Sequence, residues 1–74
     1  MPKLPIISAG RLLKALIKIG YRIVRQKGSH IRLHCDGNEP VTIPLHKEIG
    51  KGLLRKILRD ADLTADQLIE LLKK

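Results

Sequence analysis

The chain has 74 residues, the length of one small domain with a thin core, because a chain of this size buries only about 60% of the surface that its unfolded form exposes. Fifteen Lys and Arg against seven Asp and Glu give a formal charge of +8, which favours anionic partners such as nucleic acid or an anionic membrane. The single cysteine excludes an internal disulfide, and no segment has the pattern of a signal peptide or an apolar run of about 18 residues. We therefore expect residues 1–74 to form one soluble, cytoplasmic domain that does not insert into a membrane.

A helix is predicted between Ser8 and Gly20. Ser8 is a good N-cap, and Gly20 is typical of the residue that ends a helix. Between them, apolar residues recur at the spacing of one helix face, at Leu12, Leu13, Leu16 and Ile17. This pattern predicts a short amphipathic helix with its apolar face toward the core.

The middle of the chain predicts three antiparallel strands, which cover residues 21–27, 30–35 and 41–43. Gly28 and Ser29 separate the first two strands, and a two-residue loop that begins with glycine is typical of a type II′ β-hairpin. Residues 36–39 have the composition of a second turn, and Pro44 ends the third strand or places it at a sheet edge.

Two amphipathic helices are predicted after the strands. The first has apolar residues at helical spacing, at Leu53, Leu54, Ile57 and Leu58. Residues 60–63 interrupt this pattern, and Thr64 with Gln67 then forms a capping box at the start of the second helix. The apolar residues of that helix are Leu68, Ile69, Leu71 and Leu72. The order of helix, three strands, helix and helix predicts a two-layer α+β domain, in which helices cover the apolar face of the sheet.

Alternation along residues 30–35 divides the side chains of the second strand between two faces. The set expected to face the helices is apolar and consists of Ile31, Leu33 and Cys35. The set expected on the outer face is polar and consists of His30, Arg32 and His34.

The two-residue loop also predicts which residues of the hairpin lie opposite one another. It places Lys27 opposite His30, Arg25 opposite Arg32, and Val24 opposite Leu33. The same register puts Ile23 outside and Gln26 inside, so we expect a β-bulge near Gln26. The outer face then carries several like charges side by side, an arrangement that favours a polyanion lying across it.

Histidine next to cations suits the cleavage of RNA, in which the 2′-hydroxyl attacks the adjacent phosphorus. Imidazole has a reference pKa of about 6.5 and exchanges protons near neutral pH, and Lys or Arg stabilises the charge that builds on the phosphate. His30 is the candidate for proton transfer, and the turn at Gly28 and Ser29 offers backbone N–H groups and a hydroxyl to phosphate. The alternative is that His30 only begins a strand and points to solvent.

Three further residues are candidates for the second acid or base, in the order His46, Lys27 and Ser29. A zinc site is not expected, because the histidines and Cys35 lack the paired short spacings of zinc ligands. No glycine-rich phosphate loop is present, so we expect neither a metal nor a cofactor.

Several segments of the chain resemble those of the HicA toxin family. They are residues 25–30 (Arg-Gln-Lys-Gly-Ser-His), 41–46 (Val-Thr-Ile-Pro-Leu-His), 47–52 and 54–58. The resemblance extends from about residue 8 to residue 72. The sequence departs from the family at Leu53, where Thr is common, and over residues 31–33, where aromatic residues are common.

The resemblance implies a double-stranded-RNA-binding-like α-β-β-β-α fold, here with an additional short C-terminal helix. It also implies a metal-independent endoribonuclease that cleaves mRNA, with His30 as the catalytic residue, and a HicB antitoxin that binds the toxin. The residues expected to contact RNA are Arg25, Lys27, Gly28, Ser29, Arg32 and His46. Two other readings remain open: a binding module that holds double-stranded RNA without cleaving it, and a protein whose helices only dock onto another chain.

Overall fold

A computed structural model describes residue 4, residues 6–45 and residues 48–73 of the chain. The elements along the chain are α1 (Ala9–Lys18), β1 (Arg22–Lys27), β2 (His30–His34), β3 (Val41–Pro44), α2 (Lys51–Asp60) and α3 (Ala65–Leu72). This order confirms the α+β class and the predicted succession of elements. Among the described residues, no helix has the length and apolar character needed to cross a membrane.

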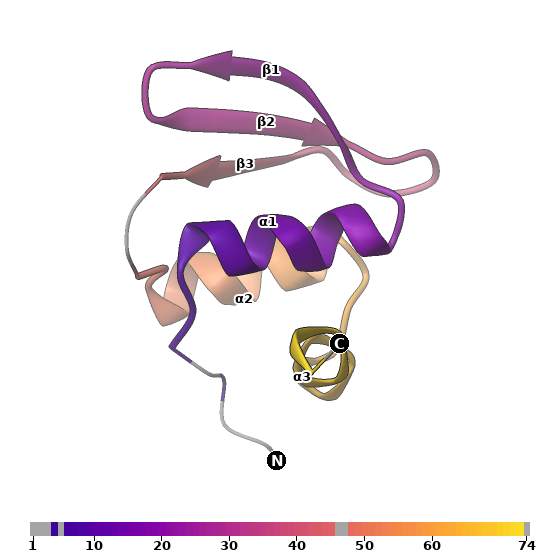
Figure 1. The fold of residues 1–74 in the computed structure, drawn as a ribbon. Coiled ribbons are helices and arrows are strands. Elements are labelled where there is room, and N and C mark those ends of the chain that lie inside the picture. The colour runs from indigo at the N-terminus through magenta and orange to yellow at the C-terminus, as the bar shows by residue number, and fades with distance from the viewer. Residues whose placement is uncertain (1–3, 5, 46–47, 74) are drawn as a thin grey trace.

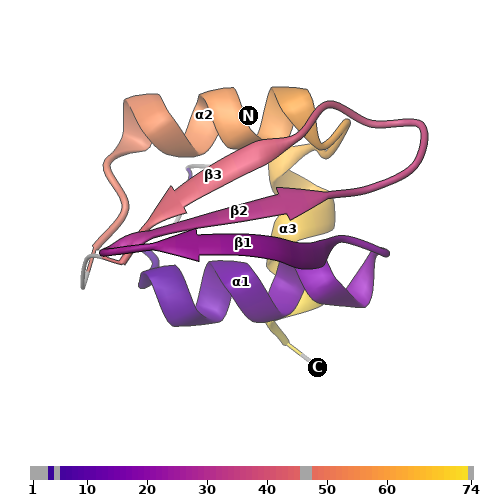
Figure 2. The ribbon, with the colours of Figure 1, turned by 90° about the horizontal axis from the view of Figure 1, so that it is seen from above.

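The strands form one antiparallel sheet in the order β1-β2-β3, and α1 and α2 lie side by side beneath one of its faces (Figures 1 and 2). α3 lies on the far side of these helices from the sheet and packs against α1. The predicted two layers therefore consist of the sheet with α1 and α2, and α3 lies outside them. A sheet of three strands is narrow, and two helices already cover its apolar face.

The helix ends follow the predicted capping chemistry. The Ser8 hydroxyl accepts a hydrogen bond from the backbone N–H of Arg11 and starts α1. Thr64 and Gln67 exchange side-chain and backbone hydrogen bonds and form the capping box of α3. The helices and β2 and β3 contribute to one core, whose fully buried side chains include Leu12, Leu16, Leu33, Ile43, Leu54, Ile57 and Leu68.

The hairpin turns at Gly28, whose φ of +58° is the left-handed value that the first position of a type II′ turn requires. Near the turn the predicted register is confirmed, with Lys27 opposite His30 and Arg25 opposite Arg32. The predicted bulge near Gln26 is wrong, because Gln26 pairs with Ile31 and the register shifts between Ile23 and Arg25.

Val24 is therefore the extra residue of the bulge, and Ile23 takes the place opposite Leu33 that the sequence had assigned to Val24. All six residues of β1 are exposed, so no buried side chain of this edge strand determines where its alternation changes. The bulge leaves the pairing next to the turn unchanged. It changes which residues of β1 lie opposite the end of β2.

A short bridge ties the segment before α1 to the segment before α2. Ile7 pairs antiparallel with Ile49, and the Ile49 N–H donates to the Ile7 carbonyl oxygen at 2.8 Å. Both side chains are buried. The starts of the two helices beneath the sheet are therefore held together directly.

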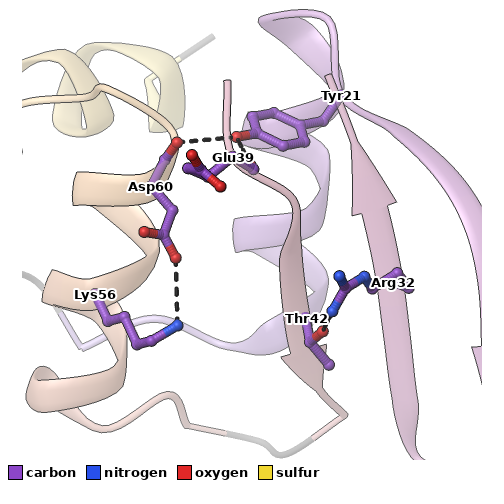
Figure 3. Close-up of polar contacts among 6 residues, drawn as sticks. All are labelled: Tyr21, Arg32, Glu39, Thr42, Lys56 and Asp60. Carbon is purple, nitrogen blue, oxygen red and sulfur yellow. Dashed lines mark hydrogen bonds and ion pairs between the residues drawn. The ribbon is translucent and has the colours of Figure 1, made fainter. Parts of the chain in front are cut away.

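Tyr21 ties the start of the sheet to the end of α2 (Figure 3). Tyr21 is a buried residue, and its hydroxyl donates to the carbonyl oxygen of Glu39 at 2.8 Å and lies 3.4 Å from the carbonyl oxygen of Asp60. Burial raises the pKa of Tyr21 above its ordinary value of 10.0, and the negative charges of Cys35, Asp60 and Glu39 act in the same direction.

We expect Tyr21→Phe to lower the free energy of unfolding by about 1 kcal/mol, because one partly buried hydrogen bond is lost. Urea unfolding at pH 7 measures this difference. The raised pKa means that the unfolded chain ionises first. The contribution of Tyr21 is therefore complete below pH 10.0 and declines as the pH rises toward the pKa in the folded state. The difference in unfolding free energy between wild type and Tyr21→Phe should narrow above that pH. A difference that stays constant would contradict this account.

Candidate nucleic-acid interface

The side chains of β2 alternate as predicted between the core and the outer face of the sheet. Ile31 and Leu33 are buried, whereas His30, Arg32 and His34 are exposed. His30 is thus in contact with solvent on the side of the sheet away from the helices, where a polymer has access to it. An imidazole packed beneath the sheet would have been incompatible with a role in RNA cleavage.

The outer face of the hairpin brings together cations from both strands. Cross-strand pairing places Lys27 next to His30 and Arg25 next to Arg32, as the sequence predicted. It also places Arg22 opposite His34, a contact that sequence reasoning missed because the bulge at Val24 was not anticipated there. We use the term outer face for Arg22, Arg25, Lys27, His30, Arg32 and His34.

His30 is held from both sides because β2 is the central strand. Lys27 of β1 is its neighbour on one side, and Pro44 of β3 is its neighbour on the other. The turn before it is also attached to β3, because the Ser29 carbonyl oxygen accepts a hydrogen bond of 2.7 Å from the Leu45 N–H. The backbone at His30 is therefore fixed by the turn and by both neighbouring strands.

Arg32 is oriented by a hydrogen bond across the sheet. Its Nη1 donates to the Thr42 hydroxyl of β3 at 3.1 Å (Figure 3). A guanidinium has five N–H donors in a planar fork, so this bond fixes the group and leaves donors for a phosphate.

Within the described residues, no ion pair reduces the positive charge of the outer face. In the described part of the chain, the ion pairs are Lys56 with Asp60 and Lys73 with Glu70, and neither includes a residue of the outer face. Clustered cations on one strand pair destabilise the hairpin slightly and attract a polyanion. The predicted contact residues Arg25, Lys27, Gly28, Ser29 and Arg32 are all exposed here, and His46 lies outside the described residues.

A groove lies beside His30, between β3 and α2, and we call it the β3–α2 groove. It has a volume of about 350 Å³ and is lined by His30, Arg32, Pro40, Val41, Thr42, Pro44, Leu53, Lys56, Ile57 and Asp60. Sequence reasoning did not anticipate this groove. The available signal was the spacing of residues 53, 56, 57 and 60, which places these side chains on one side of a helix.

The lone cysteine and a metal site are the remaining candidates that the sequence raises. Cys35 is half-buried and packs against the core, as expected for a small apolar side chain. Over residues 4, 6–45 and 48–73, no group of three or more His, Cys, Asp or Glu side chains is placed to hold a metal ion.

Comparison with known proteins shows to which family the chain belongs. The model of the family described as HicA toxin of bacterial toxin-antitoxin matches residues 9–63, from the start of α1 to just beyond the end of α2. The chain belongs to the HicA toxin family. The match to HicA contains the sheet, α1 and α2, and it ends before α3.

A solved structure described as a toxin-antitoxin complex from Streptococcus pneumoniae contains a chain similar to this HicA family member. The two share 36% sequence identity with a TM-score of 0.66, and the alignment covers 77% of this chain and 98% of the other. No curated protein matches the sequence. Membership of the HicA family gives this chain the role of a toxin.

Proposed function

We propose that this toxin is a metal-independent endoribonuclease that cleaves mRNA and thereby blocks translation, with His30 as its general acid or base. The observation that carries the proposal is the position of His30. It is exposed on the central strand, next to Lys27 and the turn, and shares the outer face with Arg25 and Arg32. Family membership supports the proposal, and the exposed face gives a long substrate access to the imidazole.

The reaction that suits this site is an internal transfer within RNA. The 2′-oxygen forms a bond to the adjacent phosphorus, the bond from phosphorus to the 5′-oxygen breaks, and a cyclic phosphate and a 5′-hydroxyl result. One group takes the proton of the 2′-hydroxyl, and one group supplies a proton to the leaving oxygen. His30 performs one of these transfers, while Lys27 and Arg32 stabilise the charge on the phosphate.

The second proton-transfer group is proposed from the same candidates as before. Lys27 lies directly opposite His30, and Ser29 precedes it in the turn. His46 follows β3 by two residues and keeps its place as the first candidate, although it lies outside the described residues.

Two features of this proposal concern fold and partner. We propose that the elements from α1 to α2 form a double-stranded-RNA-binding-like fold, to which α3 is an addition; the α-β-β-β-α order is compatible with it. The similar Streptococcus pneumoniae chain belongs to a toxin-antitoxin complex, and we propose a HicB-like antitoxin as the partner here. An acidic surface on the antitoxin would complement the outer face and accelerate association.

The test of the proposed activity uses purified protein, RNA and a chelator of divalent metals. We expect cleavage to persist in the chelator and to give products with cyclic phosphate ends. RNA with 2′-O-methyl groups throughout should remain intact, because it lacks the attacking hydroxyl. Tight binding of double-stranded RNA with no cleavage would instead favour a binding module.

We expect Arg25→Gln to weaken RNA binding to a similar degree for unrelated sequences, because a phosphate contact carries no base information. Loss of one contact should also reduce the slope of log affinity against log salt by about 0.7 for a single strand. Titration of labelled 2′-O-methyl RNA at several salt concentrations measures both effects. Arg59→Gln on α2 is the control, since it removes the same charge from a residue outside the outer face.

A further inference from the structure

The β3–α2 groove opens next to His30, and its walls differ in chemistry. Its floor is apolar, because Val41 and Ile57 are buried and Leu53 is half-buried. A cation lies on each side of the groove: Arg32 extends from β2 across to β3, and Lys56 extends from α2 toward β3 (Figure 3). An apolar floor between two cations fits a ligand with a flat apolar part and an attached anion.

The size of the groove restricts what it holds. A volume of about 350 Å³ is at the small end of the range for ligand sites, so the groove has room for one nucleotide. A base inside a double helix is covered on both faces by its neighbours and cannot lie against a protein surface. The nucleotide in the groove must therefore be unstacked, which single-stranded RNA permits at low cost.

We propose that the β3–α2 groove binds one unstacked nucleotide of single-stranded RNA beside the phosphate at His30, and that Lys56 is a positioning residue for that nucleotide. The base lies on the apolar floor, and the attached phosphate lies between Arg32 and Lys56. This inference rests on the proposed function, and it specifies single-stranded RNA as the substrate class.

Asp60 makes the two ends of the groove electrostatically different. Its carboxylate pairs with the Lys56 ammonium at 3.3 Å, four residues apart on α2. The pair holds the ammonium in the groove, and the carboxylate repels a phosphate at its own end. The phosphate is thereby directed toward Arg32 and Thr42, and the Asp60 end is left for hydrogen-bond donors of the base or ribose.

The test compares two lysines that match in charge, in exposure and in having an acidic partner on the same helical segment. Lys56 is 65% exposed and pairs with Asp60 at 3.3 Å, while Lys73 is 66% exposed and pairs with Glu70 at 3.4 Å outside the groove. Lys56→Gln and Lys73→Gln thus remove the same charge from two equally exposed side chains. Binding is measured with labelled 2′-O-methyl RNA, as a single strand and annealed to its complement.

We expect Lys56→Gln to weaken single-strand binding about fivefold, Lys73→Gln to weaken it less than twofold, and Lys56→Arg to restore it. Wild type should bind the single strand more tightly than the duplex. In cleavage assays Lys56→Gln should raise KM and leave kcat nearly unchanged, because the residue holds substrate and transfers no proton.

Equal losses for Lys56→Gln and Lys73→Gln, or equal binding of single strand and duplex, would overturn the inference. The proposed activity is judged separately. Wild type that binds the 2′-O-methyl strand through Lys56 but cuts no unmodified RNA would refute the endoribonuclease and leave the groove as a binding site. Wild type that binds no RNA would refute both.

Discussion

Replacing His30 with alanine is expected to lower the rate of RNA cleavage by a factor of about 10² to 10⁴, the contribution of a positioned acid or base. The fold should survive, because the His30 side chain is exposed and contributes nothing to the core. Single-turnover cleavage of a labelled RNA measures the rate, and thermal unfolding of the same samples checks the fold. Binding of 2′-O-methyl RNA should change little, since most of the attraction comes from the neighbouring cations.

The control for this variant is His34→Ala. His34 lies on the same face of the same strand and is also exposed, but its cross-strand neighbour is Arg22 and it is distant from the turn. We expect it to retain the cleavage rate within about threefold, a change of less than about 1 kcal/mol in barrier height. Comparable losses in both variants would show that cleavage depends on the general charge of the outer face and not on the imidazole at the turn.

Replacing Leu54 with alanine is expected to have the largest effect on stability. Leu54 is fully buried in α2, and removing its side chain costs the transfer of the lost atoms plus the cavity they leave, about 2–5 kcal/mol in total. A core of this size supplies about 3–5 kcal/mol of net stability. Much of the variant should therefore be unfolded at 25 °C, as urea titration followed by circular dichroism will show.

Leu45→Ala provides the comparison, because Leu45 is 42% exposed just after β3 and loses the same atoms. Its effect should lie within about 0.5 kcal/mol of zero, as for most surface substitutions. If the two variants lost equal stability, the core would not be centred where the burial of Leu54 places it.

Local sequence signals were sufficient for most of the fold. Ser8 and the pair of Thr64 and Gln67 marked helix starts through hydrogen bonds within one turn of chain. Gly28 marked the hairpin because few other residues adopt its backbone angle. The bulge was predicted near Gln26 and lies at Val24. The exposed side chains of β1 give no burial pattern from which a change of register can be recognised.

For the candidate site too, features set by residues close in sequence were predictable, and features set by distant contacts were not. The hairpin register and the alternation of β2 placed His30, Lys27 and Arg32 together from neighbouring positions in the sequence. The β3–α2 groove depends on how α2 packs along β3, and no local pattern determines that packing. The role of Lys56 in the groove was therefore not predictable from the sequence, although its four-residue spacing from Asp60 indicates a pair on one helix face.

The bridge between Ile7 and Ile49 bears on the order in which the molecule assembles. Joining these residues closes a loop that contains α1 and the whole sheet, whereas β1 and β2 meet across a two-residue turn. The entropy lost on closing a loop increases with its length, and contacts between distant residues form slowly. We therefore infer that the hairpin bearing the imidazole pairs early during folding, and that the two helix starts are joined late.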